Sequence, residues 1–139
     1  MAANVAFRPA DRIVVPTQGT DREFLAQQWA VELAAALGLE VHGVHVVDAD
    51  RDGQEDSTDE EIENEVFSYL KKLAGKYDVK FTTTVLHSGP IVDQLVDELS
   101  PRDICVIGTR KLSHHYHVGS VTADLIERAE CPVHVVRLE

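Results

Sequence analysis

Two loops of this sequence carry residue types that can hold a phosphate group or another anion. The first is Pro16-Thr17-Gln18-Gly19-Thr20, and the second runs from Gly108 to Ser120. The second loop ends in Gly119-Ser120 at the predicted start of a helix, where free backbone N–H groups, a hydroxyl and the positive end of the helix dipole come together. An ordinary N-cap by Ser120 explains the same two residues, so both interpretations stay open.

The second loop is also rich in basic side chains. These are Arg110, Lys111, His114, His115 and His117. They fit a local anion site within an otherwise acidic protein, and they fit a solvated polar loop equally well. Histidines this close together on a loop, with no carboxylate or cysteine fixed beside them, are poor structural metal ligands, so we expect no metal site.

The sequence offers no clear set of catalytic side chains. His42 and His134 fall inside predicted strands, where we expect them to be hydrogen-bonded members of the sheet. His45 and His87 fall nearer the carboxyl ends of strands and so nearer the two loops. A nucleophile, a base and an orienting group do not fall together, and we therefore expect no catalytic residue.

Short apolar runs alternate with amphipathic stretches along the chain. The runs predict strands at 13–15, 41–47, 81–86, 104–107 and 133–138. Capping residues predict helices that begin after Thr20, which forms a capping box with Glu23, at Ser57 or Thr58, at Pro90 and at Ser120. Such alternation is typical of a parallel sheet with helices on both faces. The predicted fold is a doubly wound, five-stranded α/β domain.

A strand order of 3-2-1-4-5 fits the composition of the strands. It places the uniformly apolar runs 13–15 and 104–107 in the middle of the sheet. It leaves 81–86, with three successive threonines, at one edge. In such a sheet ligands bind beyond the carboxyl ends of the strands at the switch point, where the two loops described above would meet.

Composition limits the possible functions. The 139 residues, 44% hydrophobic and 27% charged, predict one folded domain over 1–139, and a net charge of −11 disfavours a nucleic-acid partner. Neither a membrane span nor a signal peptide is evident, so we expect a cytoplasmic protein; the acidic composition fits a salt-adapted cytoplasm and an ordinary one. Cys105 and Cys131 lack disulfide or metal spacing and are predicted to be free thiols.

Five short motifs, in this order along the chain, resemble the universal stress protein family. They are Pro16-Thr17-x-Gly19-Thr20, His45-Val46-Val47-Asp48, Gly89-Pro90, Ile107-Gly108-Thr109-Arg110, and Gly119-Ser120-Val121 with Cys131-Pro132-Val133. The resemblance covers almost the whole chain. It implies the same 3-2-1-4-5 Rossmann-like fold of the adenine nucleotide alpha hydrolase-like type, a cytoplasmic location and dimers. It also implies that ATP or AMP is a possible ligand, since some members bind ATP and others do not.

The resemblance also suggests a nucleotide site. By matching position, Pro16, Thr17, Gln18 and Val46 would line an adenosine pocket, and Gly108, Gly119 and Ser120 the phosphate side. The chain departs from the ATP-binding pattern because Gln18 replaces an acidic residue and Lys111 replaces a glycine. In addition, 10 residues separate Gly108 from Gly119, where the pattern has about twelve.

Three functions therefore remain open. The first is a dimeric stress-response or regulatory module with an altered nucleotide cleft. The second is a member that keeps an adenine nucleotide bound, with slow hydrolysis or none. The third is an enzyme of the related superfamily, although the first loop lacks the usual pyrophosphate-binding pattern of such enzymes. For any of them, the apolar last strand lies at a sheet edge, so we expect a homodimer through Val133, Val135 and Leu138.

Overall fold

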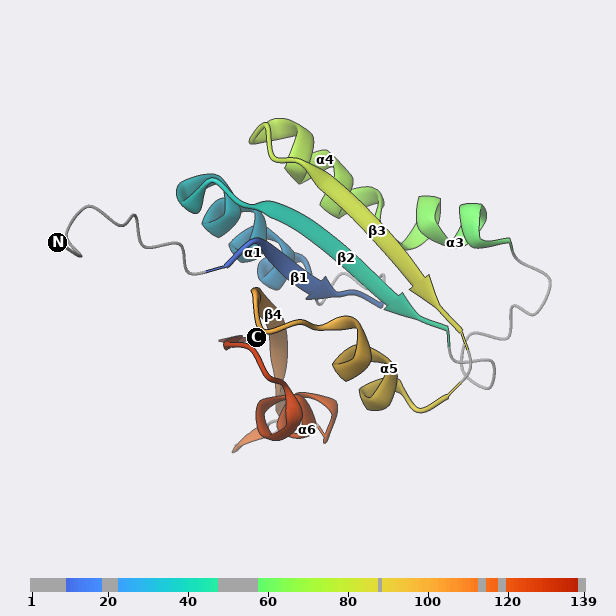
Figure 1. The fold of residues 1–139 in the computed structure, drawn as a ribbon, viewed down its shortest axis with the longest axis vertical. Coiled ribbons are helices and arrows are strands. Elements are labelled where there is room, and N and C mark those ends of the chain that lie inside the picture. The colour runs from blue at the N-terminus through green and yellow to red at the C-terminus, as the bar shows by residue number, and fades with distance from the viewer. Residues whose placement is uncertain are drawn as a thin grey trace, which may run out of the picture.

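The structure, a computed structural model, describes residues 10–18, 23–47, 58–87, 89–112, 115–117 and 120–137. Its strands are β1 (Arg12–Pro16), β2 (Glu40–Val46), β3 (Phe81–Leu86), β4 (Asp103–Leu112), β5 (His115–His117) and β6 (Val133–Arg137). Its helices are α1 (Phe24–Leu37), α3 (Asp59–Val66), α4 (Ser68–Lys76), α5 (Ile91–Glu98) and α6 (Ser120–Arg128). Figure 1 shows β1, β2 and β3 side by side, with α1 and α4 on one face and α5 on the other.

The order of the parallel strands confirms the prediction. They lie in the order β3-β2-β1-β4-β6, where β6 is the fifth predicted strand. In the central strand, Ile13 lies opposite Val41 of β2 and opposite Ile104 of β4. In the described part of the chain β6 pairs with β4 alone, so β6 forms an edge of the sheet, as predicted. Because all these strands are parallel, their carboxyl ends meet at one end of the sheet.

Two apolar layers hold the helices on the sheet. Ile13 and Val15 face the layer under α1 and α4, whereas Val14 faces the layer under α5 and α6. These three side chains of β1 are at most 1% exposed, so the strand is buried on both faces. Complete burial of such a side chain stabilises the fold by about 1.5–3 kcal/mol, which explains why this run is uniformly apolar.

The second predicted helix is interrupted in its middle. Thr58 caps α3 as expected, because its Oγ1 accepts a hydrogen bond from the Glu61 N–H at 3.2 Å. The chain leaves the helix at Phe67, and α4 begins at the next residue. The Phe67 side chain is 2% exposed and lies against Gly43 of β2. Val66, one residue earlier, is partly buried and also packs against the core.

The fourth strand is longer than predicted. β4 continues from the expected 104–107 to Leu112, and Arg110 to Leu112 pair antiparallel with His115 to His117. The second loop is therefore partly a β-hairpin, in which the backbone groups of one short strand satisfy those of the other. Residues 113–114 lie outside the described residues.

Helices α1 and α4 end in similar turns. Gly38 follows α1 with φ 71°, and Asp78 follows the end of α4 with φ 54°. In each turn the next N–H bonds back into the helix, from Leu39 to the Ala34 carbonyl at 2.9 Å and from Val79 to the Ala74 carbonyl at 2.8 Å. A glycine or a short polar residue adopts this left-handed conformation at low cost, and the chain then enters β2 and β3 in register.

The contact between Gly43 and Phe67 gives a first testable prediction. An alanine Cβ at position 43 would lie 2.8 Å from Phe67 Cε1, too close for a buried ring to accommodate. Gly43→Ala should therefore lower the free energy of unfolding by about 1–3 kcal/mol. Urea unfolding followed by circular dichroism measures this change.

Gly75→Ala is the matched control, since a Cβ at position 75 of α4 would meet nothing within 4 Å. It should raise the free energy of unfolding by about 0.5–1 kcal/mol, because alanine costs less backbone entropy in a helix. A Gly43→Ala protein as stable as the wild type would contradict the close packing of Phe67 on β2.

Candidate functional site

The predicted site residues lie on three neighbouring strands. Pro16 ends β1 and is paired with Val44 of β2, and Val46 ends β2 with its side chain 1% exposed. Gly108 lies in β4, on the other side of β1. Because β1 pairs in parallel with both β2 and β4, these three residues lie toward the same end of the sheet, as expected. Ser120 is the first residue of α6; Gly119 lies outside the described residues.

The loop after β1 is held by its own backbone and by its threonine. The Thr17 N–H donates to the Val44 carbonyl at 2.8 Å, and the Thr17 hydroxyl donates to the Val15 carbonyl at 3.1 Å. The Thr17 side chain is fully buried, whereas Gln18 is exposed. Thr17 is therefore a structural part of the loop, and Gln18 has the side chain that can reach a ligand.

Two further side chains hold this loop. His45 Nδ1 lies 2.8 Å from the Thr17 carbonyl oxygen, and both carboxylate oxygens of Glu23 lie within 2.9 Å of the Gln18 nitrogen. The position of His45 near the two loops agrees with the prediction from the sequence, which gave it no partner. For Glu23 the sequence predicts a capping box with Thr20, which lies outside the described residues.

A contact that was not predicted ties α6 to β4. The Thr122 hydroxyl donates to the Gly108 carbonyl at 3.4 Å, and the Thr122 side chain is 4% exposed. Arg128 at the other end of α6 forms an ion pair with Asp93 of α5 at 2.8 Å. These contacts fix the position of α6, so its first turn lies beside Gly108 of β4. A helix N-terminus in that position favours an anion.

One further polar pair lies at this end of the sheet, just after β3. His87 Nε2 lies 2.6 Å from Asp59 Oδ1, but both side chains are more than half exposed. In the described part of the chain, no three His, Cys, Asp or Glu side chains come together as metal ligands. His114 lies outside the described residues, so the prediction of no metal at that loop stays a prediction.

The cysteines are free thiols, as predicted. Cys105 is fully buried in β4, and burial raises the pKa of its thiol to about 12. Burial also raises the pKa of Cys131. Nucleophilic chemistry requires a thiolate, and the environment of both residues disfavours one.

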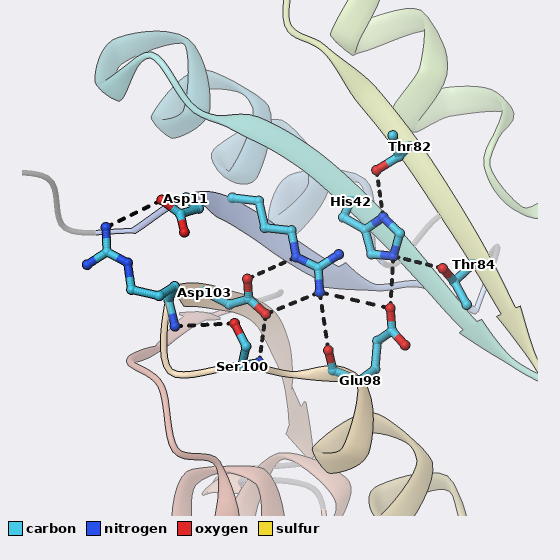
Figure 2. Close-up of polar contacts among 9 residues, drawn as sticks. Asp11, His42, Thr82, Thr84, Glu98, Ser100 and Asp103 are labelled. Atoms are coloured by element: carbon cyan, nitrogen blue, oxygen red, sulfur yellow. Dashed lines mark hydrogen bonds and ion pairs between the residues drawn. The ribbon is translucent and has the colours of Figure 1, made fainter.

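A second polar cluster lies toward the amino ends of the strands, and Figure 2 shows its members crossing from β1 to β3. At its centre, Arg12 Nε donates to Asp103 Oδ1 at 2.9 Å, and Arg12 Nη2 donates to the Glu98 carbonyl at 3.2 Å. Asp103 also accepts a hydrogen bond from the Ser100 N–H at 2.8 Å. These bonds join the ends of α5, β1 and β4. Removing either Arg12 or Asp103 would leave the charge of the other poorly solvated and unpaired.

His42 extends this cluster to the edge strand. Its Nε2 lies 3.2 Å from Glu98 Oε1 and 2.9 Å from Thr84 Oγ1, and its Nδ1 lies 2.6 Å from Thr82 Oγ1. Because a carboxylate only accepts, we assign the ring hydrogen to Nε2, and Nδ1 then accepts from the Thr82 hydroxyl. His42 is therefore a hydrogen-bonded sheet residue, as predicted. His134 is exposed on β6, with its ring centre 5.6 Å from that of Trp29.

A hollow of about 360 Å³ opens at the opposite end from the predicted site. It lies between the ends of α1 and α4, and its lining includes Gly38 and Asp78. Lys80 and Glu40, which also line it, are paired with each other at 3.3 Å. The two helix-ending turns account for its shape, and we assign it no ligand.

Comparison with known proteins identifies the family. The sequence profile of the universal stress protein family matches residues 9–137. The chain belongs to this family. A universal stress protein of Methanocaldococcus jannaschii is 30% identical to it, over 91% of this chain and 81% of the relative. None of the helices in the described residues has the length and apolar run needed to cross a bilayer.

Solved structures of universal stress proteins share the fold. One from Archaeoglobus fulgidus is 28% identical, with a TM-score of 0.67 over 92% of this chain and 98% of that one. Another from the same organism, in complex with dAMP, is 24% identical, with a TM-score of 0.66 over 94% of this chain and 99% of that one. The match over nearly the full length of both chains agrees with the strand order described above.

The buried His42 gives a prediction about pH. Burial and then the positive charge of Arg12 lower the pKa of His42 below its ordinary value of 6.5, and outweigh the opposite effect of Glu98 and Asp103. At a pH between the lowered pKa of the folded state and the ordinary pKa of the unfolded state, His42 therefore takes up a proton when the protein unfolds. The contribution of His42 to the free energy of unfolding is constant above about pH 6.5 and is lost as the pH falls through the window below it.

Urea unfolding from about pH 7.5 to about pH 5.5 tests this. The wild type should lose more unfolding free energy over that range than His42→Gln, which keeps hydrogen-bonding groups but does not titrate. Equal losses in the two proteins would show that His42 does not titrate differently in the folded and unfolded states.

Proposed function

We propose that this chain is a regulatory universal stress protein that binds an adenine nucleotide weakly, at the carboxyl ends of β1, β2 and β4, and does not act primarily as an enzyme. The observation that carries the proposal is the convergence of three strand ends with the N-terminus of α6. Pro16 and Val46 lie on adjacent strands, and the Thr122 hydroxyl holds α6 against Gly108. This arrangement places the half-buried Pro16 on one side and the backbone N–H groups of the first turn of α6 on the other.

The chemistry at the two sides matches the two halves of a nucleotide. The half-buried Pro16 and the exposed Gln18 offer apolar contacts and hydrogen bonds for a purine and ribose, whereas the Val46 side chain is buried in the core, so only its backbone could contact the ligand. The first turn of α6, which begins at Ser120, offers its N–H groups and dipole to a phosphate. The role of Gly119 and of the Ser120 hydroxyl rests on the sequence pattern alone.

The hairpin in the second loop supports weak binding. Arg110 to Leu112 pair with His115 to His117, so part of the loop uses its backbone groups in a ladder with itself. Those groups are then less available to phosphate oxygens. The absence of a glycine at Lys111, the shortened loop and the uncharged Gln18 act in the same direction.

The alternative is a universal stress protein that holds ATP or AMP tightly, with slow hydrolysis or none. The relative from Archaeoglobus fulgidus in complex with dAMP supports an adenine nucleotide as the ligand class. Catalysis is less well supported, because the Thr17 hydroxyl and the His45 ring are both bonded to backbone carbonyls. We propose a cytoplasmic location, which the free thiols of Cys105 and Cys131 support.

We also propose a homodimer through the edge of β6. The Cys105 N–H bonds to the Pro132 carbonyl, so by alternation Val133 and Val135 direct their backbone groups away from β4. Trp29 is 48% exposed on α1 beside His134, and Ile126 of α6 is 51% exposed.

Ile126 lies on the opposite side of α6 from Arg128, the residue that pairs with α5. Apolar side chains thus flank the β6 edge on both faces of the sheet, which favours an antiparallel pairing of β6 with its mate in a closed dimer. Leu138 lies outside the described residues, so its part in the interface stays a prediction.

Isothermal titration calorimetry with AMP and ATP tests nucleotide binding. We expect dissociation constants above about 1 μM for the wild type and weaker binding for Ser120→Ala. Ser68→Ala is the matched control, because Ser68 is likewise the first residue of a helix, and its hydroxyl donates locally, to the Glu65 carbonyl of α3. Tight ATP binding that is lost in Ser120→Ala would favour the alternative, and tight binding that survives it would place the ligand elsewhere.

The dimer is tested with proline substitutions and light scattering. Val135→Pro should shift the protein toward monomer while leaving the β4 ladder intact, because it removes an outward N–H donor. Val85→Pro is the matched control at the opposite edge, since the bonds from Val41 to Lys80 and from Val47 to Leu86 direct the Val85 N–H away from β2. If light scattering gave the monomer mass of 15.4 kDa for the wild type at high concentration, in both low and molar salt, the dimer would be contradicted.

A further inference from the structure

One peptide group in the candidate site is bound by side chains at both of its polar atoms. The carbonyl oxygen of Thr17 and the N–H of Gln18 belong to the same peptide unit. The carbonyl lies 2.8 Å from His45 Nδ1, and the nitrogen lies 2.9 and 2.8 Å from the two carboxylate oxygens of Glu23. His45 comes from β2 and Glu23 from the start of α1, so two separate elements hold this one peptide.

The chemistry of the two partners fixes the direction of each bond. A carbonyl oxygen only accepts, so His45 Nδ1 must donate, and Glu23 accepts the Gln18 N–H. If the peptide rotated by half a turn, its N–H would face the Nδ1–H of His45, and its carbonyl would face a carboxylate. Both contacts would then be repulsive, so the pair permits one orientation of the peptide.

The position of His45 indicates more than a need for a stable core. Its side chain is 3% exposed, in a strand whose neighbouring buried positions, Val44 and Val46, hold aliphatic residues. Burying an imidazole has a cost that its hydrogen bonds must offset. In this protein the bond to the Thr17 carbonyl is made at the very loop from which Gln18 projects.

We propose that His45 and Glu23 are positioning residues of the nucleotide site, which hold the Thr17–Gln18 peptide in a single orientation before the ligand arrives. This inference rests on the proposed function, because it concerns the loop that would contact the adenosine part of the ligand. We call His45 and Glu23 together the clamp. The clamp reduces the ordering that binding must otherwise impose on this loop, so it raises the affinity for the nucleotide. Neither residue needs to touch the ligand.

Three substitutions test the clamp by AMP titration. His45→Leu removes the donor, Glu23→Ala removes the acceptor, and His45→Asn keeps an N–H donor at a position close to Nδ1. We expect the first two to weaken AMP binding about 10-fold and His45→Asn to restore most of the affinity. If His45 only stabilised the fold, His45→Asn and His45→Leu proteins with the same unfolding temperature would bind AMP equally weakly.

His42→Leu is the matched control, because His42 is another buried histidine of β2 whose hydrogen bonds are to β3 and α5. The affinity of the His42→Leu protein for AMP should stay within about twofold of that of the wild type. Equal AMP binding in the wild type, His45→Leu and Glu23→Ala would overturn the clamp. An equal loss in His42→Leu and His45→Leu would also overturn it, since it would show that any loss of β2 packing weakens the site.

Hydrogen exchange of the Gln18 amide, without ligand, separates this inference from the proposed function. The amide should be protected in the wild type and should exchange at least about tenfold faster in both Glu23→Ala and His45→Leu. Unchanged exchange would overturn the clamp whatever the ligand. A wild type that shows this protection but binds no AMP would contradict the proposed function, and with it the role of the clamp in binding.

Discussion

The parallel pairing of β1 with β2 on one side and with β4 on the other is the constraint on which the rest of the structure depends. It brings Pro16, Val46 and Gly108 to one end of the sheet. A slip of one residue in β1 would move Val14 from one apolar layer to the other and break both layers at once. The core therefore fixes the register, and the register fixes the candidate site.

The fold was predictable because burial controls the composition of its strands. Residues 13–15 of β1 are covered on both faces and are uniformly apolar, whereas β3 lies at an edge and holds three threonines, so the strand order can be inferred from the sequence. The helix break at Phe67 could not be inferred from the sequence in this way. It depends on the space above Gly43, a contact between residues far apart in the chain. The extension of β4 was also missed, because Arg110 and Lys111 interrupt the apolar pattern.

The candidate site was predictable in location and less so in its supporting contacts. Strand ends and a helix start placed the loops, but hydrogen-bond partners depend on the tertiary structure. His42 bonds to Thr82 and Glu98, which are 40 and 56 residues away in the sequence. Glu23 was expected to serve the start of its own helix, and its carboxylate holds the preceding loop instead. Local patterns identified these residues as polar and well placed, and only the fold showed their partners.

The burial of Cys105 has a consequence for the chemical durability of the protein. With a thiol pKa of about 12, the thiolate fraction at pH 7 is on the order of 10⁻⁵. Peroxides and electrophiles attack the thiolate, so the folded chain offers them almost no target at Cys105. A cell under oxidative attack would therefore damage this thiol mainly in molecules that have already opened. Folding itself therefore protects Cys105 from oxidation.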